Sequence, residues 1–221
     1  MTTAPRPGNP RIESTLKSLR EAGFTDPVHV FAEPGSPRPS CQQHWHEHAE
    51  KHGPWRNWRA GLRFLAEMND ADALYAMVQD DFVVRPGTAA YLDQTVKSNN
   101  VYSPYTAASE LGRIGAKLAV EQGGQGWYYS AAGWWFCGAL FFCFNMRVLH
   151  TLNHFLPETV ERNMNIDAHV ASVGGRNGVG VVVHRPSLVC HTGDDKDTGS
   201  TMGYRPGGAV RRAAGFVDAP L

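Results

Sequence analysis

Helix-like and strand-like patterns alternate through the first hundred residues of the chain, and this order limits the possible folds more than any other feature. Apolar residues at helical spacing predict helices over residues 10–23 and 55–69. Each is followed by a short apolar run of strand length, at Val28–Ala32 and Leu74–Val78. Such alternation is typical of a sheet covered by helices. We therefore expect a single α/β domain, Rossmann-like, with a mixed, mostly parallel sheet flanked by helices.

The composition supports a globular chain and gives no sign of a strongly charged partner. Hydrophobic residues make up 42% of the 221 residues and charged residues 19%, enough for a packed core. Basic and acidic residues number 21 each, so no overall field attracts nucleic acid. The four cysteines show no CxxC spacing, and the first residues lack the apolar segment of a secretory signal. We expect a cytoplasmic protein with no membrane partner.

Polar residues follow several of the predicted strands. Glu33, the pair Asp80-Asp81 and His191 all stand where an apolar run ends. In α/β sheets, ligands bind at the carboxyl ends of the strands, so these residues could meet at one edge. Adjacent carboxylates are costly to bury without a cation, and Mg²⁺ or Mn²⁺ would accept them together with diphosphate oxygens. An imidazole ligand would favour Mn²⁺. The alternative is that Asp80-Asp81 begins a turn and caps backbone amides.

A series of segments stands in a characteristic order along the chain: Met1–Pro7, Leu16–Phe24, Val30–Gly35, Trp55–Leu65, Val78–Val83, Gly138-Ala139, Asp167 and Pro186–Gly193. Their order and spacing resemble those of GT-A fold glycosyltransferases. The similarity is to small, inverting, metal-dependent members with a DXD-type motif, among them viral and phage-type enzymes. It extends from Met1 to about Met202.

The resemblance implies a role for each matching residue. Asp81 and His191 would bind the metal, Mn²⁺ or Mg²⁺. Asp80 would touch the donor's ribose or a metal-bound water. Family members often carry a third acid where this chain has Gln79. The remaining donor contacts would come from Thr3, Ala4, Pro5, Arg6, Glu33, Asn57, Gly138, Ala139 and Lys196.

The implied activity is transfer of a sugar from a nucleotide-diphosphate donor, UDP-linked by preference, to an acceptor hydroxyl with inversion. Asp167 resembles the general base that takes the proton from that hydroxyl. Residues 1–100 would form the nucleotide- and metal-binding half, residues 101–202 the acceptor and catalytic half, and residues 203–221 a tail. The acceptor could be a glycan, a small molecule or a hydroxymethylated base in DNA, for which Arg205, Arg211 and Arg212 would suit phosphate contacts.

Two clusters outside these motifs allow other interpretations. The aromatic residues of 127–135 could stack on a sugar or a base: Trp127, Tyr128, Tyr129, Trp134 and Trp135. The histidine-rich segment His44–His52 could bind zinc or form a polar, acceptor-facing segment.

Two other functions stay open. A nucleotidyltransferase would use a similar sheet and acidic metal ligands, but it would need a Gly-rich loop with basic residues after the first strand, where Arg6 stands alone. A non-catalytic module could bind sugars or nucleotides through the aromatic segment.

Overall fold

The computed structural model describes residues 1–5, 11–41, 43–107, 114–120, 126–130, 138–160, 165–192 and 215–216. Helices and strands alternate through its first half, as the sequence predicts. None of the helices in these ranges combines the length and apolar character needed to cross a bilayer.

The first half of the chain builds a small parallel sheet. It has the order β1 (Thr2–Thr3), β2 (His29–Ala32) and β3 (His44–Glu47). Thr3 pairs with Ala32, and Ala32 pairs with Glu47, so the carboxyl ends of all three strands lie at one edge.

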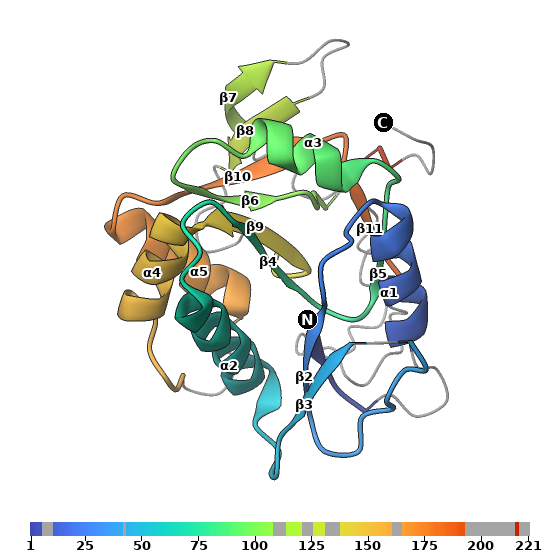
Figure 1. Cartoon of the computed structure of the whole chain (residues 1–221). Helices are drawn as coiled ribbons and strands as arrows, with labels where there is room; N and C mark the ends of the chain where they lie inside the picture. Colours follow the sequence, from blue (N-terminus) through green and yellow to red (C-terminus); the bar gives the residue numbers. More distant parts are fainter. Residues whose placement is uncertain are drawn as a thin grey trace, which may run out of the picture.

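A six-stranded sheet forms the centre of the molecule (Figure 1). Its order is β4 (Leu74–Val78), β9 (Phe141–Asn145), β6 (Asn100–Ser103), β10 (Gly180–Arg185), β8 (Gly126–Ser130) and β7 (Ile114–Val120). A two-stranded ribbon joins β5 (Phe82–Val84) to β11 (Val189–His191). Asp80 and Asp81 lie in the three residues between β4 and β5, so the ribbon places the end of β11 beside them.

Helices lie on both sides of the central sheet (Figure 1). On one side are α2 (Gly53–Met68), α4 (Met146–Phe155) and α5 (Ile166–Arg176); on the other are α1 (Ile12–Glu21) and α3 (Thr88–Thr95). Side chains of β9 alternate between the two cores: Phe142 and Phe144 join the α2/α4/α5 side, Phe141 and Cys143 the α1/α3 side. This period of two is the reason why an all-apolar run can form a strand buried on both faces.

Glycine allows one close approach in this packing. A Cβ on Gly61 of α2 would stand 3.0 Å from the Met77 Cε on β4. Helix α2 therefore sits directly on the sheet, and its N-terminal half reaches the carboxyl ends of the strands.

The mixed α/β expectation is confirmed, with two differences of detail. Of the eight strand pairings among the described residues, five are antiparallel, more than a mostly parallel sheet would have. The reason is that β9 runs back between β4 and β6, and β8 runs back beside β10. The second difference is β8, a strand over Gly126–Ser130 where our sequence analysis gave none.

Candidate donor and metal site

The ends of β1 and β4 meet through a pair of side chains. The Thr3 hydroxyl donates a hydrogen bond of 2.5 Å to Asp80 Oδ2, between residues 77 apart in sequence. Both side chains are buried, with 3% of each residue exposed. Thr15 of α1 adds its hydroxyl, which donates to the main-chain oxygens of Asp80 and Phe82. Asp80 is thus held through its side chain by β1 and through its main chain by α1.

Glu33 and Asn57 complete the edge at β1 and β2. The Asn57 amide of α2 donates to the carbonyl oxygens of Thr3 and Phe31, both at 3.2 Å. Glu33 is 4% exposed and its Oε2 accepts from the His52 amide at 2.9 Å. Its Oε1 is buried and has no hydrogen-bond partner among the described residues. A buried carboxylate oxygen of this kind is suited to a donor group on a bound ligand.

Asp81 and His191 are in direct contact although 110 residues separate them. His191 Nε2 lies 3.1 Å from Asp81 Oδ2, and the side chains are 21% and 7% exposed. The ribbon of β5 and β11 creates this contact, because it pairs His191 with Phe82. The Thr192 amide also donates to the Asp81 carbonyl at 2.9 Å. The histidine at the end of the last strand is therefore held in place by main chain on both sides.

The distance between these two atoms fits a shared divalent ion. Two ligand atoms that bind one ion at about 2.1 Å and at a right angle stand about 3 Å apart. Within the described ranges, no group of three or more His, Cys, Asp or Glu side chains is arranged to hold a metal ion. Two protein ligands are nevertheless enough for Mg²⁺-type sites in which substrate phosphates and water supply the rest.

Asp167 anchors the segment that resembles the floor of a sugar site. Its Oδ1 accepts hydrogen bonds from the amides of Gly138, at 2.9 Å, and of Ala139. The Gln79 amide in turn donates to the Leu140 carbonyl at 3.0 Å. Asp167, Gly138 and Ala139 therefore adjoin the end of β4, next to Asp80-Asp81. Both amides bind the same carboxylate oxygen, Oδ1.

Some residues that we assigned to the site lie elsewhere or outside the described ranges. Ala4 and Pro5 follow β1 directly. Outside the described residues lie Arg6, Trp134, Trp135, Lys196, Arg205, Arg211 and Arg212.

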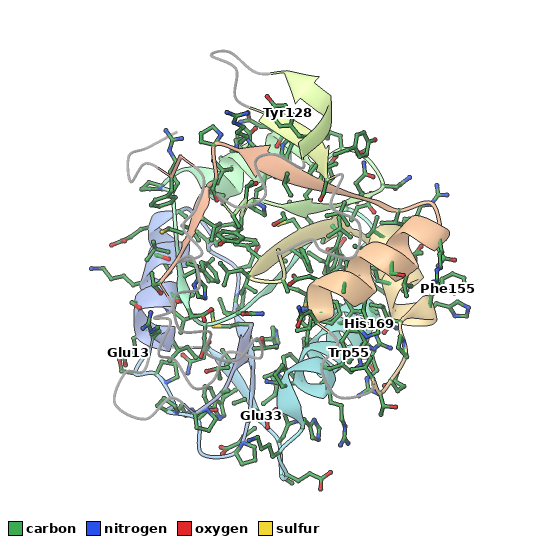
Figure 2. All side chains as sticks on the ribbon, turned by 180° about the vertical axis from the view of Figure 1, so that it is seen from behind. Glu13, Glu33, Trp55, Tyr128, Phe155 and His169 are labelled. Carbon is green, nitrogen blue, oxygen red and sulfur yellow. The ribbon has the colours of Figure 1, made fainter. Side chains whose placement is uncertain are left out.

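Of the aromatic cluster, the described residues Trp127 and Tyr128 lie away from this edge. Trp127 is 1% exposed, and its ring lies 4.9 Å from those of Tyr102 and His184, within the core. Figure 2 shows Tyr128 and Glu33 at opposite ends of the molecule. The alternation of β8 explains the difference, since a strand beside β10 must turn one face of its aromatic residues inward.

The segment His44–His52 forms no zinc cluster among the described residues; instead it supplies β3 and the chain that leads to α2. His48 Nε2 lies 2.9 Å from Asn57 Oδ1 and completes the hydrogen bonding of that amide.

The sequence interpretation missed three contributors to this edge: Thr15, His48 and Thr192. Thr192 Oγ1 is buried beside the Asp81–His191 pair and has no partner among the described residues. Its only signal in the sequence is its position directly after His191.

No protein-family model matches the chain, and the search of curated proteins finds no match. Among solved structures, the chain is similar to a nucleoside-diphosphate-sugar pyrophosphorylase from Vibrio cholerae RC9. The TM-score is 0.45 at 13% sequence identity, over 87% of this chain and 95% of that one.

Proposed function

We propose that this protein is a metal-dependent glycosyltransferase that uses a nucleotide-diphosphate sugar, with UDP as the first nucleotide to test. The observation that supports this proposal is the contact of Asp81 with His191 at 3.1 Å, next to the Thr3–Asp80 bond. A carboxylate and an imidazole 110 residues apart in sequence are brought to one point, at an edge where α/β sheets bind ligands.

Asp81 and His191 are the residues that would hold Mn²⁺ or Mg²⁺. When bound, the ion would offset the negative charge that develops on the departing diphosphate. Mn²⁺ is the better choice of the two because one ligand is an imidazole.

The donor would lie along the edge from β1 to β4. Glu33 Oε1 would accept a hydrogen bond from the ribose or base, and Asn57 would keep β1 and β2 in register around it. Asp80 would face the ribose or a metal-bound water. Gly138 and Ala139 have little or no side chain, which leaves room for a sugar ring near Asp167.

In the transfer step, the acceptor hydroxyl oxygen forms a bond to the anomeric carbon. The bond from that carbon to the diphosphate oxygen breaks, and its electron pair leaves with the nucleoside diphosphate. Asp167 takes the proton of the attacking hydroxyl, a role that contributes about 10²- to 10⁴-fold in comparable enzymes. Attack opposite the leaving group inverts the anomeric centre.

Thermal unfolding with UDP and Mn²⁺ tests the binding part of this proposal. At about 100 times its Kd, a ligand stabilises by about 2.7 kcal/mol, which would raise the Tm of a chain of this size by about 5–10 °C. We expect this shift only when both are present. Asp81→Asn should remove it, and the exposed Asp72→Asn should keep it. A shift with UDP alone that survives Asp81→Asn would contradict the metal assignment.

Turnover of a UDP-sugar tests the catalytic part. Asp167→Asn keeps an oxygen that can accept the two amide bonds, so it should bind UDP and Mn²⁺ normally and lose about 10²-fold or more in UDP release. Asp167→Ala should also disturb the 138–139 segment and weaken binding. Pyrophosphate release from UTP and a sugar phosphate, without UDP release from the nucleotide sugar, would instead indicate a nucleotidyltransferase.

A further inference from the structure

Five of the ten histidines lie on β2, on β3 and in the segment from β3 to α2, in two groups of stacked rings. We call His29, His44, His46, His48 and His52 the histidine ladder. The ring of His29 on β2 stacks on His44 of β3 at 4.5 Å, and its Nδ1 lies 3.0 Å from the Nε2 of His46. His48 and His52 stack at 3.9 Å, just beyond the end of β3.

The ladder leads directly to the proposed donor site. The His48 amide donates to the Ala32 carbonyl at 3.0 Å, the last backbone bond between β2 and the β3 segment before Glu33. The His48 ring holds Asn57, and the His52 amide holds Glu33 Oε2. All three contacts come from His48 and His52, which stack on each other, and they bind Glu33 itself, the preceding residue Ala32, and Asn57.

The arrangement of the ladder disfavours protonation of its rings. A hydrogen bond between two imidazoles holds one proton, so His29 and His46 cannot both be protonated without placing two N–H groups against each other. Burial, followed by the neighbouring His44 and His46, lowers the pKa of His29 to about 4. Burial and neighbouring positive charge likewise lower the pKa of His46 and of His52.

Few anions face the ladder to relieve this charge. Phe64 of α2 covers the rings of His29 and His46 and is uncharged. Glu47 at the end of β3 accepts bonds from the Gly35 amide and the Trp45 indole. The charged groups that act on the ladder are the amine of Met1 and the side chains of Arg56, Glu33 and Glu50. Glu33 and Glu50 favour protonation of His52, but burial and the positive charges of His48 and Arg56 outweigh them and lower its pKa.

We propose that the histidine ladder is a proton-sensitive latch for nucleotide binding: when its rings become charged, the 44–52 segment separates from β2 and releases Glu33 and Asn57. The inference rests on the proposed function for its ligand, but the opening of the segment can be measured without any ligand.

Hydrogen exchange tests the latch in the intact protein. The measured exchange rates are first corrected for the intrinsic pH dependence of exchange. Below pH 6.5, the opening constant of the His44, His48 and His52 amides should then rise by about tenfold per pH unit for each histidine whose ring is released when the segment opens. Amides of α4 should not show this selective increase. The double variant His29→Gln, His46→Gln should lose much of it, whereas the exposed pair His150→Gln, His154→Gln should keep it.

Calorimetry with UDP and Mn²⁺ at pH 7.5 and pH 5.5 separates this inference from the proposed function. We expect binding at pH 7.5 and at least about tenfold weaker binding at pH 5.5, with a smaller loss in the His29/His46 variant. If UDP does not bind at pH 7.5, the proposed function fails, and hydrogen exchange still decides on the latch. If exchange of the 44–52 amides follows that of α4 at both pH values, the latch is wrong whatever UDP does. Should the double variant fail to fold, NMR titration of the native histidines decides: ordinary titration of His29 and His46 with unchanged 44–52 exchange would overturn it.

Discussion

At the scale of single residues, the candidate site depends on side chains that hold carboxylates in fixed positions. Asp80 and Asp81 are 3% and 5% exposed, and two adjacent acidic groups are seldom buried without specific partners. Thr3 and His191 provide such partners from strands at opposite ends of the sequence. The sequence allowed the prediction that these residues share one edge, because each follows an apolar run. It could not predict that Thr3 donates to Asp80, because a threonine in a two-residue strand carries no distinctive sequence signal.

Thr3→Val tests the importance of that hydroxyl. Valine has nearly the same shape but removes a hydrogen bond to a buried carboxylate, so the free energy of unfolding should fall by about 1–3 kcal/mol at pH 7. The matched change Thr2→Val, on the same strand, should cost clearly less. Urea unfolding of both variants makes the comparison, and equal stability of the two would show that the Thr3–Asp80 bond contributes little.

At the scale of helices and strands, regular periodicity was enough to locate many elements. The predicted bounds of β4 agree with the structure, those of β2 differ by one residue, and the apolar spacing located α1 and α2 within a few residues. Elements that long-range pairing stabilises were missed: β3 is rich in histidine, and β8 begins at a glycine and is held by β10 and β7. Strand order and direction could not be predicted, because no local pattern indicates that β9 inserts between β4 and β6.

The start of α4 provides a prediction at this scale. Asn145 Oδ1 accepts from the Val148 amide at 3.1 Å, the hydrogen bond of an N-cap residue. Asn145→Ala should therefore lower the free energy of unfolding by about 1 kcal/mol, whereas Asn145→Asp, which keeps the acceptor, should cost less. Chemical denaturation distinguishes the two, and equal losses would mean that the cap is not what stabilises this end of α4.

Helix α4 also supports the site from a distance. Arg59 of α2, 2% exposed, donates to the side chain and the carbonyl of Asn153 and pairs with Glu158 at 2.8 Å. These contacts fix α2 along its length and thereby fix Asn57, one half-turn away. Contacts from α2 to the second half of the chain thus help to position Asn57 at the edge where we propose that the donor binds.

At the scale of the whole molecule, a histidine buried in the central sheet makes the free energy of unfolding depend on pH. His184 of β10 is fully buried; its Nδ1 donates to the Pro186 carbonyl at 2.6 Å, and Tyr91 donates to its Nε2 at 2.7 Å. This is the pattern of the neutral ring, with one nitrogen as donor and the other as acceptor. Burial lowers the pKa of His184 to about 4, while the unfolded chain has the ordinary value of about 6.5.

The sign of the pH effect follows from these two values. Between about pH 6.5 and 4 the unfolded chain binds a proton at His184 that the folded chain does not, so stability decreases as the pH falls through this range. The loss is at most about 1.4 kcal/mol per pH unit for this one residue. Urea unfolding at pH 7.5, 6.0 and 5.0 should show it, and His184→Gln should reduce the slope. A slope that is unchanged in the variant would assign the effect to other groups.

The central claim is that one divalent ion, held by Asp81 and His191, binds the diphosphate of the donor. Pulsed electron paramagnetic resonance on the complex with Mn²⁺ and UDP tests it most directly. We expect a histidine-nitrogen coupling to Mn²⁺ that disappears in His191→Asn and persists in the exposed control His150→Gln, together with a phosphorus coupling from UDP. A Mn²⁺ signal without histidine nitrogen, or one unaltered by His191→Asn, would contradict the account.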